Sequence, residues 1–113
     1  MQKLSVIITT FNEASNIEAC LESVKWADEI IIVDSYSTDE TVSISQQYTS
    51  KIFQRKYLGP ADQKNWAIPQ ATHQWILILD ADERVSLSLK DEIITILQQD
   101  QLKDAYWLSL IHI

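Results

Sequence analysis

The chain has 113 residues, of which 46% are hydrophobic and 22% charged, so it is long enough for one domain with its own core. Sixteen acidic residues outweigh nine basic ones, and the largest basic cluster is the pair Arg55-Lys56. This balance argues against direct binding of nucleic acid. Cys20 is the only cysteine, which excludes an internal disulfide and suits a reducing compartment.

Strand-like and helix-like segments alternate along the chain. Residues 4–10 are β-branched and apolar nearly throughout, which predicts a strand buried on both faces rather than a signal peptide or a membrane span. Further strands are expected at 29–34, 51–54, 75–79 and 105–113, and helices near 15–24, 37–48, 61–68 and 89–97. The spacing Ser-x-x-Glu at 15–18 and 37–40 predicts capping boxes at two of the helix starts. The alternation indicates an α/β fold with a mostly parallel sheet.

The end of the chain has its own pattern. Residues 105–113 are apolar and strand-like, with no turn or cap after them, which predicts a domain that is incomplete at its C-terminus. Residues 108–113 also resemble a translated sequencing adapter, so we expect them to be a non-native tail. The prediction is one incomplete domain over 1–113.

Polar side chains follow three predicted strands at their carboxyl ends, where open parallel sheets bind ligands. Glu13 comes after the first strand, Asp34 ends the second, and Asp80 and Asp82 follow the one at 75–79. Four carboxylates on one rim repel each other unless a cation lies among them. Hard oxygen ligands suit Mg²⁺ or Mn²⁺ with phosphate oxygens completing the shell. The sequence therefore predicts a divalent metal and a polar ligand at this rim.

Four motifs, in order, resemble family 2 glycosyltransferases. They are Ser5–Glu13, Ile31–Thr41, Gly59–Asn65 and Ile78–Glu83, the last containing the Asp-x-Asp motif. The resemblance extends to about Leu102. It is nearest to the bacterial branch that adds a sugar to the lipopolysaccharide inner core, of the β-1,4-glucosyltransferase type. It implies the donor-binding half of a GT-A (Rossmann-like) fold.

The resemblance also implies roles for individual residues. Thr9, Phe11 and Glu13 would line the nucleoside pocket, Asp34 would hold the base or ribose, Lys64 would lie near the diphosphate, Asp80 would face the ribose, and Asp82 would bind Mg²⁺ or Mn²⁺. The chain departs from the family where Asp34-Ser35 replaces paired aspartates and where Tyr36 stands in place of glycine.

The activity that the resemblance implies is inverting transfer of a hexose from a nucleotide-diphosphate sugar to a glycan or glycolipid acceptor, expected to be lipopolysaccharide core. It implies a cytoplasmic protein associated peripherally with the inner face of the cytoplasmic membrane. In the family the general base comes from later in the chain, so no catalytic residue is assigned. We expect the 113-residue chain alone to bind donor without useful transfer.

Other readings stay open at this point. A nucleotidyltransferase would share the sheet and the metal but needs a glycine-rich loop after the first strand, and 9–13 contains no glycine. A non-catalytic nucleotide-binding domain is the third possibility. Several of these residues also have a purely structural explanation. The charge of Glu13 could stabilise the start of the next helix, and Asp34 could be a turn residue. Lys64 could be a solvated charge on a helix, and Asp82 could cap the turn that follows it.

Overall fold

Four parallel strands form the sheet at the centre of the structure, a computed structural model that describes residues 2–98. The strands are β1 (Leu4–Thr10), β2 (Glu29–Asp34), β3 (Ile52–Gln54) and β4 (Trp75–Asp80), in the order β3-β2-β1-β4. All three neighbouring pairs run parallel, so every carboxyl end lies at one edge of the sheet. The predicted α/β class and parallel sheet are confirmed.

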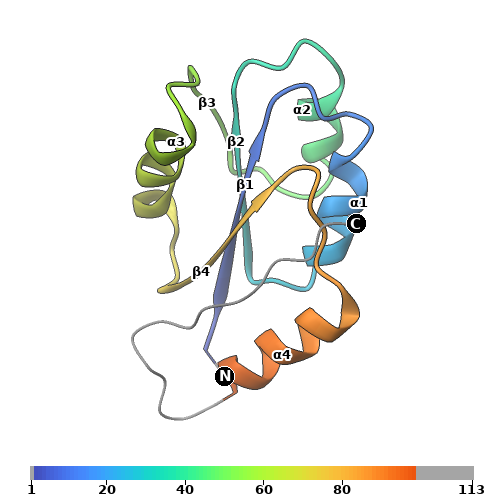
Figure 1. Ribbon diagram of the computed structural model, residues 1–113, viewed down its shortest axis with the longest axis vertical. Helices are drawn as coiled ribbons and strands as arrows, with labels where there is room; N and C mark the ends of the chain where they lie inside the picture. The colour runs from blue at the N-terminus through green and yellow to red at the C-terminus, as the bar shows by residue number, and fades with distance from the viewer. Residues whose placement is uncertain (1, 99–113) are drawn as a thin grey trace.

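Helices cover both faces of this sheet. They are α1 (Ile17–Val24), α2 (Thr41–Ser45), α3 (Pro60–Ala67), which a short 3-10 turn η1 (Ile68–Gln70) continues, and α4 (Leu87–Leu97). Figure 1 shows α3 on one side of the sheet and the other helices on the opposite side. Within residues 2–98, no helix combines the length and the apolar character needed to cross a bilayer. The strand predicted at 105–113 and the tail at 108–113 lie outside the described residues.

The alternation of side chains along the strands builds two apolar layers. Ile8 and Ile32 belong to the layer that α1 and α4 cover, together with Leu21 of α1. Ile7 and Ile31 point the other way and pack with Ala67 of α3. A strand that is apolar at every position is therefore what a sheet covered on both faces requires.

Both predicted capping boxes are absent, although the helices begin close to the expected places. The N-cap residues are Asn16 and Glu40, and neither side chain accepts a capping hydrogen bond. Ser37 has another partner, since its hydroxyl donates to Asp34. Among the helices within residues 2–98, α4 alone has a side-chain cap, where Ser86 Oγ accepts a 3.1 Å bond from the amide of Leu89.

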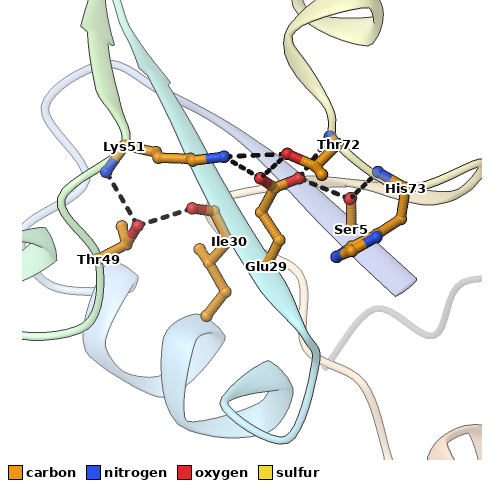
Figure 2. A network of polar contacts seen from close by, with 7 residues as sticks. All are labelled: Ser5, Glu29, Ile30, Thr49, Lys51, Thr72 and His73. Carbon is orange, nitrogen blue, oxygen red and sulfur yellow. Dashed lines mark hydrogen bonds and ion pairs between the residues drawn. The ribbon is translucent and has the colours of Figure 1, made fainter. Parts of the chain in front are cut away.

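The amino end of the sheet is held together by the half-buried residue Glu29 (Figure 2). It accepts hydrogen bonds from the hydroxyls of Ser5 and Thr72, from the amide of Thr72, and from the ammonium of Lys51. Burial of the side chain, which is 7% exposed, raises the pKa of Glu29, but these donors outweigh it and lower the pKa to about 2. This network joins β1, β2 and the segments that precede β3 and β4, at the edge opposite the candidate site.

Candidate functional site

A cavity of about 430 Å³ opens at the carboxyl edge of the sheet, beside the ends of β1, β2 and β4. Its lining residues are Thr9, Thr10, Phe11, Glu13, Ser35, Tyr57, Pro60, Gln63, Lys64, Asp80, Ala81 and Asp82. The parallel sheet brings these segments together from positions up to 73 residues apart in the chain, as the span from Thr9 to Asp82 shows. Ligand sites of open α/β sheets lie at this edge.

A tight turn at the end of β4 shapes one side of the cavity. The amide of Asp80 donates to Glu83 Oε1 at 2.7 Å, and the amide of Glu83 donates to the carbonyl of Asp80 at 2.9 Å. Glu83 is 4% exposed, so its carboxylate is committed to the turn. Asp82 is exposed and has no hydrogen-bond or ion-pair partner among residues 2–98. The turn thus leaves Asp82 available to a ligand.

The loop after β1 is held in place by the loop after β2. The amide of Asn12 donates to Ser37 Oγ at 2.8 Å, and the amide of Glu13 donates to Thr41 Oγ1 at 2.8 Å. In return, Asn12 Oδ1 accepts from the amide of Thr38 at 2.7 Å. These bonds fix the backbone directly after Phe11, whose ring lines the cavity while 58% exposed. The hydroxyls in 37–41 therefore order the site rather than contact its ligand.

Asp34 does not line the cavity, in contrast to the role that the resemblance implies. Its side chain is fully buried. The carboxylate accepts from Thr10 Oγ1 at 2.6 Å and from both the amide and the hydroxyl of Ser37. A carboxylate saturated by these donors is fixed inside the protein, and it is the next residue, Ser35, that reaches the cavity.

Helix α3 supplies the wall opposite β4. It follows Gly59, whose φ of 111° lies in a region that favours glycine, and begins with Pro60 at its first turn. An ion pair of 2.6 Å between Arg55 and Asp62 ties the helix to the end of β3. This fixed position brings Lys64 to the cavity.

The charge of the lining favours a metal with a phosphate ligand. Glu13, Asp80 and Asp82 contribute three carboxylates, whereas Lys64 contributes one ammonium. A free diphosphate entering here meets repulsion that a divalent cation would relieve. Within residues 2–98, no three potential metal-ligating side chains of His, Cys, Asp or Glu cluster together. The lining carboxylates offer the hard oxygen ligands of an ion such as Mg²⁺, which takes one or two carboxylates and completes its shell with phosphate and water.

Six of the seven candidate residues come together. Thr9, Phe11, Glu13, Lys64, Asp80 and Asp82 line one cavity, whereas Asp34 lies behind it. The sequence reasoning gave no individual role to the other six lining residues, which are Thr10, Ser35, Tyr57, Pro60, Gln63 and Ala81. For Ser35 and Gln63 the available signal was their place within the motifs Ile31–Thr41 and Gly59–Asn65.

Comparison with known proteins identifies this arrangement. The model of the family described as Glycosyl transferase family 2 matches residues 5–106. The chain belongs to glycosyl transferase family 2. Its four-stranded parallel sheet with flanking helices corresponds to about a third of the GT-A fold of this family.

Relatives in family 2 are substantially longer than this chain. An uncharacterized glycosyltransferase of Rickettsia felis is 46% identical over 94 residues, covering 82% of this chain and 33% of that protein. The lipopolysaccharide core biosynthesis glycosyltransferase LpsC of Rhizobium meliloti is 36% identical, covering 78% and 34%. The crystal structure of Staphylococcus aureus TarS 1–349 in complex with UDP-GlcNAc superposes with a TM-score of 0.66 at 31% identity, covering 83% and 31%. The chain thus spans about a third of these proteins.

Proposed function

We propose that this chain is the donor-binding part of an inverting hexosyltransferase, which uses a nucleotide-diphosphate sugar and a divalent metal. The observation that carries the proposal is the shared cavity of Phe11, Lys64 and Asp82, which offers an aromatic face, a cation and an exposed carboxylate to one ligand. The TarS structure contains UDP-GlcNAc, which supports a uridine donor here as well.

Asp82 is the residue we propose to hold Mg²⁺ or Mn²⁺. Its carboxylate lines the cavity without a partner among residues 2–98, whereas Asp80 is already oriented by Thr9. Held by Asp82, the ion would offset the negative charge that the diphosphate carries as the leaving group. Because the protein supplies so few ligands, we expect the metal to bind measurably only together with the nucleotide.

The other lining residues complete the donor site. Lys64 would lie beside the diphosphate and offset its charge, and Asp80 would accept a hydrogen bond from a ribose hydroxyl. Thr9, Phe11 and Glu13 would surround the nucleoside, with the exposed ring of Phe11 available for stacking. Asp34 would act indirectly, by holding the loop that positions this wall.

The acceptor we propose is a lipopolysaccharide-core glycan or glycolipid, reached at the inner face of the cytoplasmic membrane. The similarity to LpsC supports this choice of acceptor. Inverting transfer also needs a general base beside the acceptor hydroxyl. We assign that base to none of the described carboxylates, because Glu83 faces its own backbone and Asp34 is fully buried.

Calorimetry of nucleotide binding tests the proposal. UDP should bind the chain in the presence of Mn²⁺ or Mg²⁺ and lose affinity when the metal is chelated, and neither ion should bind by itself. Equal affinity with metal and with chelator would remove the metal from the proposal. An assay of a full-length relative with a labelled nucleotide-sugar donor tests the alternative. Transfer of the nucleotidyl group, and not of the sugar, would favour a nucleotidyltransferase.

A further inference from the structure

An exposed carboxylate outside the cavity joins the loops that follow β1 and β2, which lie side by side beyond the carboxyl edge of the sheet (Figure 1). It belongs to Asp39, whose Oδ2 accepts a 3.1 Å hydrogen bond from the amide of Ala14. Its Oδ1 accepts from the amide of Thr41 at 3.0 Å and from the hydroxyl of the same residue. Asp39 does not line the cavity, so any effect that it has on a ligand passes through other residues.

Thr41 extends this connection to the preceding amide of the loop. Its side chain is fully buried, and its Oγ1 accepts a 2.8 Å bond from the amide of Glu13 while its hydrogen is donated to Asp39. The bond from this hydroxyl, above all, lowers the pKa of Asp39, which is therefore charged at neutral pH. A hydroxyl that donates to a carboxylate becomes a better acceptor, because hydrogen bonds in a chain polarise one another. Together the two residues hold the consecutive amides of Glu13 and Ala14.

The stretch that this pair holds carries two lining residues of the cavity, Phe11 and Glu13. Glu13 is also held from its other side, since its Oε2 accepts a 3.0 Å bond from Asn16 Nδ2 and its carbonyl accepts from the amide of Asn16 at 2.9 Å. Neither Asp39 nor Thr41 lines the cavity itself. A wall that is ordered before the ligand arrives costs less conformational entropy on binding.

We propose that Asp39 and Thr41 are positioning residues of the donor site, which raise its affinity for the nucleotide by holding the loop after β1 without touching the ligand. This inference rests on the proposed nucleotide-sugar function. The pair acts on the loop after β1, whereas the proposed metal ligand, Asp82, follows β4. The pair should therefore set the affinity for the nucleotide and leave its metal dependence unchanged.

Calorimetry of UDP binding in the presence of Mn²⁺ compares two substitutions at Thr41. Thr41→Val keeps the shape of the side chain but removes the hydroxyl, which leaves the amide of Glu13 without its acceptor, so the affinity should fall about tenfold. Thr41→Ser retains the hydroxyl and should bind UDP within about twofold of the unaltered chain. Urea unfolding of each variant verifies that the folded protein is measured. Ser45→Ala removes a buried hydroxyl that donates to the carbonyl of Thr41 within α2, and as the matched control it should leave the affinity unchanged.

Asp39→Asn is a second test, at an exposed position where the substitution leaves the core intact. The side-chain amide keeps one accepting oxygen and loses the other, so the affinity for UDP should fall about threefold. Glu40→Gln removes the same charge from the next residue, whose side chain makes no capping hydrogen bond, and should have no effect. In Thr41→Val and Asp39→Asn alike, the ratio between the affinities with Mn²⁺ and with chelator should equal that of the unaltered chain.

Several outcomes would overturn the inference and leave the proposed function standing. Unaltered affinity of Asp39→Asn does so even if Thr41→Val fails to fold. Equal losses in Thr41→Ser and Thr41→Val do so because packing at this position, and not the hydroxyl, would then decide the affinity. A changed metal dependence would place the effect at the ion instead. Binding of no nucleoside diphosphate by the unaltered chain with metal would overturn the proposed function together with this inference, which distinguishes the two failures.

Discussion

Thr9 Oγ1 donates a 3.1 Å hydrogen bond to Asp80 Oδ1, which joins the carboxyl ends of β1 and β4. The two residues are also direct partners in the parallel register of the sheet. This bond occupies one oxygen of Asp80, whereas Asp82, two residues later, has no such bond within 2–98. The two aspartates of the Asp-x-Asp motif are therefore not equivalent, and we expect their substitutions to differ.

Asp82→Ala should abolish the metal dependence of nucleotide binding. Removing the carboxylate that would contact the ion should lower the affinity for UDP with Mn²⁺ about tenfold to a hundredfold, to the level seen with chelator. Calorimetry with and without metal measures this. Asp91→Ala, at an exposed position on α4, removes the same charge away from the cavity and is the matched control. If nucleotide binding by Asp82→Ala still depended on metal, Asp82 would not be the ligand of the ion.

Asp34→Ala should lower the stability of the folded protein. The substitution leaves the hydroxyls of Thr10 and Ser37 without their buried acceptor and frees the loop that Ser37 anchors. We expect a loss of about 3 kcal/mol in the free energy of unfolding, since hydrogen bonds to charged groups are among the stronger ones. Urea unfolding measures this. If Asp34→Ala kept the urea midpoint of the unaltered chain but bound nucleotide weakly, Asp34 would contact the nucleotide directly.

Stability should fall in acid because of Glu29. The pKa of Glu29 in the folded protein is about 2, below its ordinary value of 4.5, so its contribution is complete above about pH 4.5 and is lost as the pH falls towards 2. The difference corresponds to at most about 3 kcal/mol. Urea unfolding between about pH 6 and pH 2.5, a range that covers most of this window, measures the loss.

Glu29→Gln should flatten this acid dependence and destabilise the protein at neutral pH. Glu22→Gln is the matched control, because Glu22 also has a lowered pKa, owing first to the hydrogen bond from Tyr48, but lies in solvent. It should leave most of the acid dependence in place. An identical pH profile for Glu29→Gln and the unaltered chain would show that the network of Figure 2 contributes nothing to stability.

Cys20 should be chemically inert in the folded protein. The thiol is fully buried, and burial, followed by the nearby charge of Glu83, raises its pKa to about 12. Because the thiolate is the reactive form, a disulfide reagent at pH 8 should label Cys20 only as fast as the chain unfolds. Denaturant provides the control, since it should make labelling immediate. Rapid labelling under native conditions would contradict the burial of this helix face.

The sequence by itself determined the elements and most of the site. Apolar strands such as β1 and the polar residues at their ends are local patterns, and a parallel sheet must gather those ends at one edge. This is why Thr9, Glu13 and Asp82 could be assigned to one cavity before their positions were known. The start of α2 was less predictable, because the hydroxyl of Ser37 donates a hydrogen bond to the buried carboxylate of Asp34 and does not cap the helix.

Only the tertiary structure decided which polar residues face the ligand and which face the protein. Asp34 and Ser35 are neighbours in sequence at the same strand end, yet one is saturated by internal donors and the other lines the cavity. Gln63 was recognised as a lining residue only from the packing of α3 beside the end of β2, where its Nε2 donates to Ser35 Oγ. Composition and spacing cannot distinguish such cases, because hydrogen-bond partners distant in sequence are fixed by packing.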